Sequence, residues 1–177
     1  RGMIKLFSDH IETYIFRRRS RRIQILCLHR APGTPLPGVW QPVTGRRERG
    51  ERALVAAARE VREETGLEPI RWWGLETISI WFESANERFV ALPLFAAEAS
   101  PDAEVTLSRE HDAYRWLAPR AASASFAWQT QRRALEALDR EVLRGESAHL
   151  LDRTALLAEL EQPASTRRRK RPPSGEL

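Results

Sequence analysis

The sequence has few cysteines, since its 177 residues include a single one. One cysteine cannot form an intramolecular disulfide, and Cys27 lies in the strand-like run 23–28, which predicts a buried thiol in a reducing compartment. No run of about 18 apolar residues occurs, so no helix is expected to span a membrane. Asp9, His10 and Glu12 interrupt the apolar runs near the start, and we expect no signal peptide. These absences favour a cytoplasmic protein.

Methionine is equally scarce. Met3 is the only one in the chain, so we expect the natural chain to begin there, with Arg1 and Gly2 preceding it. The length suits one domain with a sizeable core, expected over residues 3–162. Residues 163–177 form a basic, low-complexity tail that cannot bury apolar area, and we expect it to be disordered.

Positive charge exceeds negative charge, with 29 Lys and Arg residues against 24 Asp and Glu residues. The excess is local, because the segment 17–22 carries five arginines and the segment 167–171 carries five more cations. Without the tail cations the formal net charge is about zero. A solvated turn and a solvated tail are the default interpretation. The alternative is attraction of polyanions, including RNA, with nucleic acid expected to bind only through the tail.

Apolar periodicity predicts strands with helices packed around them. The expected strands are 11–16, 23–28, 39–44, 75–82, 88–95 and 113–117, and the expected helices are 51–65, 128–143 and 150–160. The loop 31–38 contains three prolines and two glycines, and 84–87 is typical of a turn. Mixed strands with helices outside form an α/β (α+β) sandwich.

Acidic residues crowd one side of the helix expected at 51–65. Leu54, Ala57, Ala58 and Val61 recur at helical spacing, which predicts an apolar stripe facing the core. The glutamates follow the edge of this stripe.

Glu60 and Glu64 project side by side, and Glu63 lies one turn from Arg59. Carboxylates this close repel one another, so a cation is expected among them. Mg²⁺ suits the place because it binds one or two carboxylates together with water and substrate phosphates. Gly66 is expected to end the helix in a left-handed conformation. The alternative interpretation is a solvated acidic helix face.

The spacing around this helix resembles the signature of the Nudix hydrolases. That signature is G, five free positions, E, seven free, R-E-U, one free, E-E, one free and G-U, where U is aliphatic. Residues 45–67, GRRERGERALVAAAREVREETGL, match it throughout, at Gly45, Glu51, Arg59, Glu60, Val61, Glu63, Glu64, Gly66 and Leu67. The resemblance implies a Nudix-type sandwich with residues 45–67 as its catalytic loop-helix-loop.

The resemblance also implies residue roles. Glu60, Glu63 and Glu64 would bind Mg²⁺, for which Mn²⁺ can substitute, and Glu110 would be a further ligand or the general base. Arg59, Glu64 and Glu110 form the expected catalytic set. Gly45, Glu51 and Gly66 would be structural. The alternative for Glu110 is an exposed carboxylate that precedes a strand.

Further segments resemble one group of the family, the bacterial dihydroneopterin triphosphate diphosphatases, also called dATP pyrophosphohydrolases. Residues 40–45, WQPVTG, are similar to its W-Q-x-V-T-G segment, and residues 110–117, EHDAYRWL, to its E-H-x-A-Y-K-W-L segment. The similarity covers about residues 10–140. The region between Ile80 and Glu110 is shorter than in that group, which leaves the substrate open.

The six tryptophans are expected mostly in the core, although Trp40 or Trp81 could stack on a base or pterin.

Three functions remain open. The first is a Mg²⁺-dependent pyrophosphohydrolase that cleaves a nucleoside- or pterin-triphosphate-type substrate to a monophosphate and pyrophosphate. The second is a hydrolase of dinucleoside polyphosphates or RNA 5′ ends, with the arginines holding the polyanion. The third is a non-catalytic, Nudix-like nucleotide-binding module. The expected partner is a small phosphoanhydride and not a membrane, and a homodimer is compatible with the sequence.

Overall fold

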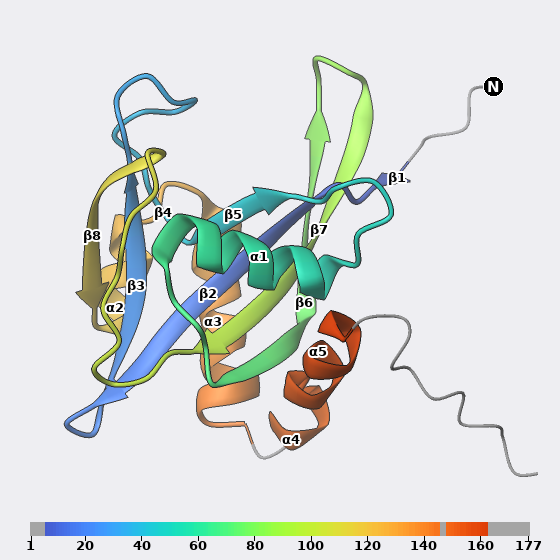
Figure 1. Ribbon diagram of the computed structural model, residues 1–177. Helices are drawn as coiled ribbons and strands as arrows, with labels where there is room; N and C mark the ends of the chain where they lie inside the picture. The colour runs from blue at the N-terminus through green and yellow to red at the C-terminus, as the bar shows by residue number, and fades with distance from the viewer. Residues whose placement is uncertain (1–5, 146–147, 163–177) are drawn as a thin grey trace, which may run out of the picture.

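A computed structural model describes residues 6–145 and 148–162 and shows a mixed sheet with helices on both faces (Figure 1). The strands are β1 (Leu6–Phe7), β2 (His10–Arg19), β3 (Arg22–Arg30), β4 (Trp40–Gln41), β5 (Val43–Arg46), β6 (Arg71–Glu83), β7 (Arg88–Glu98) and β8 (His111–Leu117). The helices are α1 (Ala53–Thr65), α2 (Pro119–Ser125), α3 (Gln129–Leu138), the π-helical turn η1 (Asp139–Leu143), α4 (Ala148–Leu151) and α5 (Thr154–Glu161). The expectations for Arg1, Gly2, Met3 and the tail 163–177 fall outside the described residues.

The long strand β2 organises the sheet. Along one edge it pairs in parallel with β7. Along the other edge it pairs with β5 over His10–Thr13 and with β3 over Phe16–Arg19. The sheet therefore divides at β2 into two branches, and β4 and β8 extend the β3 branch.

Each face of the sheet buries its own apolar cluster. On one face α1 packs its Leu54 and Val61 against Ile11 and Ile15 of β2, and Leu157 of α5 joins the cluster. On the other face α2 and α3 cover a second cluster. Its buried members are Tyr14, Phe16, Ile25, Cys27, Trp73, Leu75, Leu92, Leu94, Ala96, Ala122, Phe126, Ala134, Leu135, Leu138 and Val142. Successive residues of β2 thus face opposite layers, as strand geometry requires.

The expected α/β sandwich and the central helix are confirmed. Helix α1 begins two residues later than expected and ends at Gly66, whose φ is 65° and whose N–H donates to the Arg62 carbonyl. The arginine-rich turn between β2 and β3 is also confirmed, with Ser20 and Arg21 both at positive φ, as a two-residue hairpin requires.

The arginines of this turn have partners within the fold. The Arg17 guanidinium lies 4.2 Å from the centroid of the Trp116 ring. Arg18 pairs with Glu98 at 3.1 Å. These contacts support the structural interpretation of the turn. Cys27 is buried as expected, and burial raises the pKa of its thiol to about 11.

The helices after residue 117 differ from the expectation. Helix α2 was not expected, and the helix expected at 150–160 is two helices separated at Asp152. Asp152 accepts a hydrogen bond from the Thr154 N–H at 2.8 Å and pairs with Arg71 of β6 at 2.8 Å. The Thr154 hydroxyl in turn accepts the Trp72 N–H at 3.0 Å. The contacts of Asp152 and Thr154 with β6 therefore interrupt the helix that the sequence pattern predicts over 150–160.

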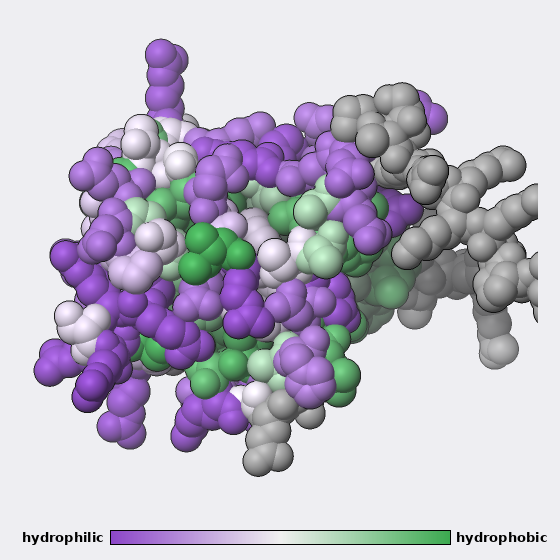
Figure 2. Space-filling view, turned by 60° about the horizontal axis from the view of Figure 1, so that its bottom comes forward, coloured by the Kyte–Doolittle hydropathy of each residue, from purple (hydrophilic) through white to green (hydrophobic). Residues whose placement is uncertain are grey.

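The surface seen from below in Figure 2 is dominated by hydrophilic side chains, with hydrophobic residues in small separate groups. Within residues 6–145 and 148–162, no helix combines the length and apolar character needed to cross a bilayer.

Candidate active site

The close contact of β5 with α1 positions the first carboxylate. Strand β5 places Gly45 directly against the Glu60 side chain, and a Cβ atom at position 45 would lie 2.1 Å from the Glu60 Cγ atom. Position 45 therefore requires glycine, because any larger residue would place its Cβ atom in the space of the Glu60 side chain. Burial raises the pKa of the Glu60 carboxyl, while the hydrogen bond from Arg59 lowers it.

We expect Gly45→Ala to displace Glu60, because the added methyl group occupies the space of its Cγ and Cδ atoms. Overpacking of this kind costs about 1–3 kcal/mol in the free energy of unfolding. Urea denaturation measures this loss. The matched control is Gly74→Ala, whose Cβ would meet Arg153 atoms at an ordinary 3.7 Å. Equal stability of the two variants would contradict the assigned role of Gly45.

Arg59 holds the acidic residues of the loop and helix together. Its guanidinium donates to both Glu51 carboxylate oxygens at 3.0 Å, to Glu60 at 2.8 Å and to Glu63 at 3.0 Å. It also donates to the Arg46 carbonyl at 2.9 Å, which ties α1 to β5. These contacts raise the pKa of Arg59 and lower the pKa of Glu51. Arg59 therefore orients the carboxylates without occupying the cavity beside them.

Glu64 is the most unusual carboxylate of the site. It is 4% exposed, and no described residue forms a hydrogen bond with its Oε2 atom. Burial raises its pKa well above the usual value, and the nearby charges of Glu60 and Glu110 raise it further. A buried carboxylate without a partner is costly, so this position suits a cation.

His111 of β8 lies against Glu64. Its Nδ1 atom is 3.9 Å from the Glu64 Oε2 atom, and both ring nitrogens are buried without a hydrogen-bond partner among the described residues. Burial lowers the pKa of His111 to about 4, so the ring is neutral near pH 7. At this distance a neutral ring forms neither an ion pair nor a hydrogen bond with Glu64.

A large cavity lies beside the acidic side chains of the site. Its volume is about 990 Å³, and Glu60, Glu64 and Glu110 all line it. The other lining residues are His10, Ile11, Glu12, Arg30, Pro35, Leu36, Gln41, Thr44, Gly45, Arg46, Ser79, Trp81, Leu92, Trp128, Gln129, Thr130 and Gln131. The lining comes from both branches of the divided sheet and from the start of α3.

The expected ligands meet only in part. Glu60, Glu64 and Glu110 share the cavity, whereas Glu63 is exposed and paired with Arg59. Glu110 is exposed and lies 3.8 Å from the Arg30 guanidinium. In the described part of the chain, no three acidic, histidine or cysteine side chains converge closely enough to hold a metal ion. The charge and burial of Glu64 nevertheless fit a divalent cation, and the carboxylates would have to turn toward it.

The tryptophans differ from the expectation. Trp81 lines the cavity and is 39% exposed, but Trp40 is not among the lining residues. Instead its ring lies 4.8 Å from the His29 ring and 4.7 Å from the Arg115 guanidinium. Trp128, one of the six tryptophans expected mostly in the core, is 48% exposed and lines the cavity. It precedes α3 rather than lying within it, so helical periodicity could not reveal its direction.

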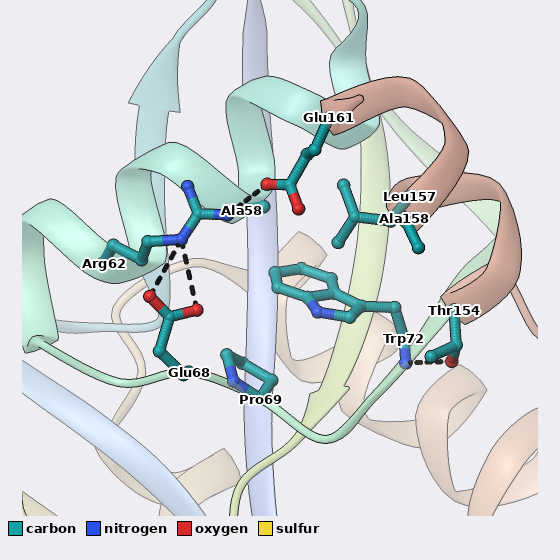
Figure 3. Close-up of a pocket in the computed structure, with 9 residues that line it drawn as sticks. All are labelled: Ala58, Arg62, Glu68, Pro69, Trp72, Thr154, Leu157, Ala158 and Glu161. Atoms are coloured by element: carbon teal, nitrogen blue, oxygen red, sulfur yellow. Dashed lines mark hydrogen bonds and ion pairs between the residues drawn. The ribbon is translucent and has the colours of Figure 1, made fainter. Parts of the chain in front are cut away.

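A second, smaller pocket of about 170 Å³ lies between α1 and α5 (Figure 3). Arg62 of α1 reaches across it to Glu68 and to Glu161 of α5, and the Trp72 ring forms part of its wall. None of the carboxylates that line the larger cavity borders this pocket. Its contacts attach α5 to the back of the acidic helix.

Comparison with known proteins agrees with the sequence motif. The family model of the NUDIX domain matches residues 9–138. An octanoyltransferase from Myxococcus xanthus is 37% identical over 106 residues, which make up 56% of this chain and 28% of that protein. An asymmetrical bis(5′-nucleosyl)-tetraphosphatase from Sus scrofa is 37% identical over 115 residues, 58% of this chain and 74% of that protein. This chain thus spans well under half the length of the first of these relatives.

The fold of this chain is similar to that of solved structures. The dihydroneopterin triphosphate pyrophosphohydrolase of E. coli superposes with a TM-score of 0.59 and is 25% identical, over 75% of this chain and 96% of that chain. The family match covers most of the described residues, including α1 and the divided sheet. With the complete motif at residues 45–67, it shows that the chain belongs to the Nudix hydrolase family.

Proposed function

We propose that the chain hydrolyses a phosphoanhydride in a Mg²⁺-dependent reaction, with a nucleoside diphosphate linked to a further group as substrate. A nucleoside or pterin triphosphate would give a monophosphate and pyrophosphate. The observation that carries the proposal is the buried carboxylate of Glu64, whose Oε2 atom has no hydrogen-bond partner among the described residues, beside Glu60 and Glu110 in a cavity of about 990 Å³. That cavity is large enough for a nucleotide.

Four glutamates are available to hold the metal: Glu60, Glu63, Glu64 and Glu110. When bound by these residues, Mg²⁺ would neutralise charge on phosphate oxygens and lower the pKa of water. Arg59 keeps Glu60 and Glu63 in place by the hydrogen bonds described above. Mn²⁺ has similar ligand preferences and is expected to substitute.

The remaining steps belong to side chains of the cavity. Either Glu64 or Glu110 accepts the proton of the attacking water. Arg30 lines the cavity beside Glu110, so its guanidinium can bind a substrate phosphate. Trp81 and Trp128 offer partly exposed indole faces on which an aromatic ring can stack.

A second candidate substrate is a dinucleoside polyphosphate. It is favoured by the 37% identity to the Sus scrofa tetraphosphatase, of which this chain covers 74%. An RNA 5′ end is a further alternative, which the five cations at residues 167–171 would help to bind. A non-catalytic module is disfavoured because Arg59, Glu60, Glu63 and Glu64 are all present.

Product analysis across a substrate panel tests the proposal. The panel contains dihydroneopterin triphosphate, the (d)NTPs, ADP-ribose, diadenosine tetraphosphate and a 5′-triphosphate RNA, each with Mg²⁺ and with EDTA. We expect Mg²⁺-dependent hydrolysis, with pyrophosphate released if a triphosphate is the substrate, and with two nucleotides and no pyrophosphate if the tetraphosphate is. Binding of panel members without any hydrolysis would show a binding module instead.

A further inference from the structure

A buried carboxylate in the same cavity takes no part in the proposed metal site. Glu12 lies on β2, is 3% exposed and lines the cavity. Its Oε2 atom accepts the Tyr14 hydroxyl at 2.8 Å, and its Oε1 atom accepts the Gln131 Nε2 at 2.9 Å. Each carboxylate oxygen can accept two hydrogen bonds, so each keeps one free acceptor position.

The charge of Glu12 has no cationic partner among the described residues, where neither an arginine nor a lysine forms an ion pair with it. Its hydrogen bonds come from two neutral groups, the Tyr14 hydroxyl and the Gln131 amide. Burial raises the pKa of Glu12, and the two hydrogen bonds oppose that rise by stabilising the carboxylate. Burying an acid in this way costs stability, which a purely structural role could avoid with a neutral residue.

The two sets of acids reach the cavity from opposite sides of the sheet. Helix α1 packs on the face of Ile11 and Ile15, whereas Glu12 and Tyr14 belong to the face covered by α3. Strand β2 changes its partner just beyond Glu12, from β5 over His10–Thr13 to β3 over Phe16–Arg19. Glu12, Glu60 and Glu64 all line the one cavity, so a substrate can place its phosphates at the α1 carboxylates and its ring near Glu12.

Aromatic and amide groups complete the surroundings of Glu12. Trp81, Trp128 and Leu92 line the same cavity and offer apolar surface to a flat ring. The Gln131 amide is oriented at both ends, since its Oε1 atom accepts the backbone N–H of Trp128 at 3.5 Å while its Nε2 donates to Glu12. A ring held here meets hydrogen-bond acceptors at Glu12 rather than donors.

We propose that Glu12 selects the heterocycle of the substrate, by accepting hydrogen bonds from a ring N–H and an adjacent exocyclic amino group. The inference rests on the proposed function of the site. The matching chemistry is the 2-amino-oxo edge that guanine and the pterins share, which presents two parallel donors to a carboxylate. Hypoxanthine keeps only the ring N–H. Adenine presents a ring acceptor beside its amino group, which a carboxylate repels.

The test compares bases within one phosphate series, using GTP, ITP and ATP, with dihydroneopterin triphosphate as the pterin arm. For the unmodified protein we expect kcat/KM to fall from GTP to ITP and again from ITP to ATP, by roughly 10- to 100-fold over the series, since a hydrogen bond to a charged group is lost. A higher kcat/KM for dihydroneopterin triphosphate than for GTP would identify the preferred heterocycle as a pterin, and the reverse order would identify it as guanine. Equal rates for GTP, ITP and ATP would overturn the inference and leave the proposed function standing.

The variant Glu12→Gln sharpens the test. Glutamine keeps the size of the side chain and can still bond to Tyr14 and Gln131, but it presents one acceptor and one donor. We expect kcat/KM for GTP to fall by roughly 10-fold or more, with little change for ATP, so that the GTP-to-ATP ratio collapses. The matched control is Glu98→Gln, a carboxylate on β7 that pairs with Arg18 outside the cavity. An unchanged ratio in folded Glu12→Gln would overturn the inference.

Binding separates the inference from the proposed function. If no member of the substrate panel is hydrolysed, the proposed function fails, but quenching of tryptophan fluorescence by GTP, ITP and ATP still measures base preference. Tighter binding of GTP would support the role of Glu12, and equal binding would overturn it. Because this comparison uses the unmodified protein, it holds even where Glu12→Gln fails to fold.

Discussion

The double variant Glu60→Gln plus Glu64→Gln is expected to lower kcat on the order of 10³-fold or more, because it removes the two carboxylates of α1 that line the cavity. Glutamine keeps the shape of each side chain and removes its charge. Steady-state hydrolysis of the substrate found in the panel measures the loss, and the fold is checked by circular dichroism.

The stability of the double variant distinguishes a metal site from a structural cluster. Glu64 is buried with a raised pKa and an unpaired Oε2 atom, so its ionised form destabilises the metal-free fold. We expect the midpoint of thermal unfolding in EDTA to stay the same or rise in the variant. Stabilisation by added Mg²⁺ should be lost, since a ligand stabilises only the state that binds it.

The matched control is Glu68→Gln, which changes an acid that follows α1 and pairs with Arg62 on the surface. It should retain both activity and the response to Mg²⁺. Near-normal turnover of Glu60→Gln plus Glu64→Gln would remove these residues from the site. A strong loss of stability in EDTA would instead indicate that the acids hold the fold.

The parts of the site that depend on local chain geometry could be predicted from the sequence. Helix α1, its left-handed end at Gly66 and the hairpin at Ser20 and Arg21 follow from spacing and turn chemistry, and all are present. The motif implied only a structural role for Gly45, and the structure supplies its steric reason, the close approach of Glu60.

The parts that depend on long-range packing could not be predicted. Glu12 and Gln131 are 119 positions apart, and they meet because α3 covers the β2 face of Tyr14. No sequence pattern distinguishes Trp40 from Trp128. In the structure Trp40 contacts His29 and Arg115, whereas Trp128 lines the cavity. No period along the chain distinguishes such partners, since they belong to elements brought together by the sheet.

Replacement of Arg59 by methionine is expected to destabilise the protein and to reduce activity together. Arg59 is the shared partner of Glu51, Glu60 and Glu63, at distances of 2.8 to 3.0 Å. Without it these carboxylates repel one another across the loop and the helix. Its side chain is 23% exposed, so the loss is smaller than for a fully buried pair, and we expect about 2–3 kcal/mol in the free energy of unfolding.

The activity of Arg59→Met should fall by roughly 10- to 100-fold, as is usual when a residue that orients metal ligands is removed. The control is Arg62→Met on the same helix. Arg62 also joins two acids, Glu68 and Glu161, but across the smaller pocket of Figure 3 and with a side chain that is 38% exposed. It should cost about 1 kcal/mol or less and leave kcat unchanged.

Salt dependence tests the electrostatic origin of the Arg59 effect. Repulsion among partly exposed carboxylates is screened at about 1 M salt, where the Debye length is near 3 Å. The instability of Arg59→Met relative to the unmodified protein should therefore shrink in 1 M NaCl, and Mg²⁺ should reduce it further by binding the same acids. A loss that is independent of salt and Mg²⁺ would assign Arg59 a packing role, in which its hydrogen bond to the Arg46 carbonyl joins α1 to β5.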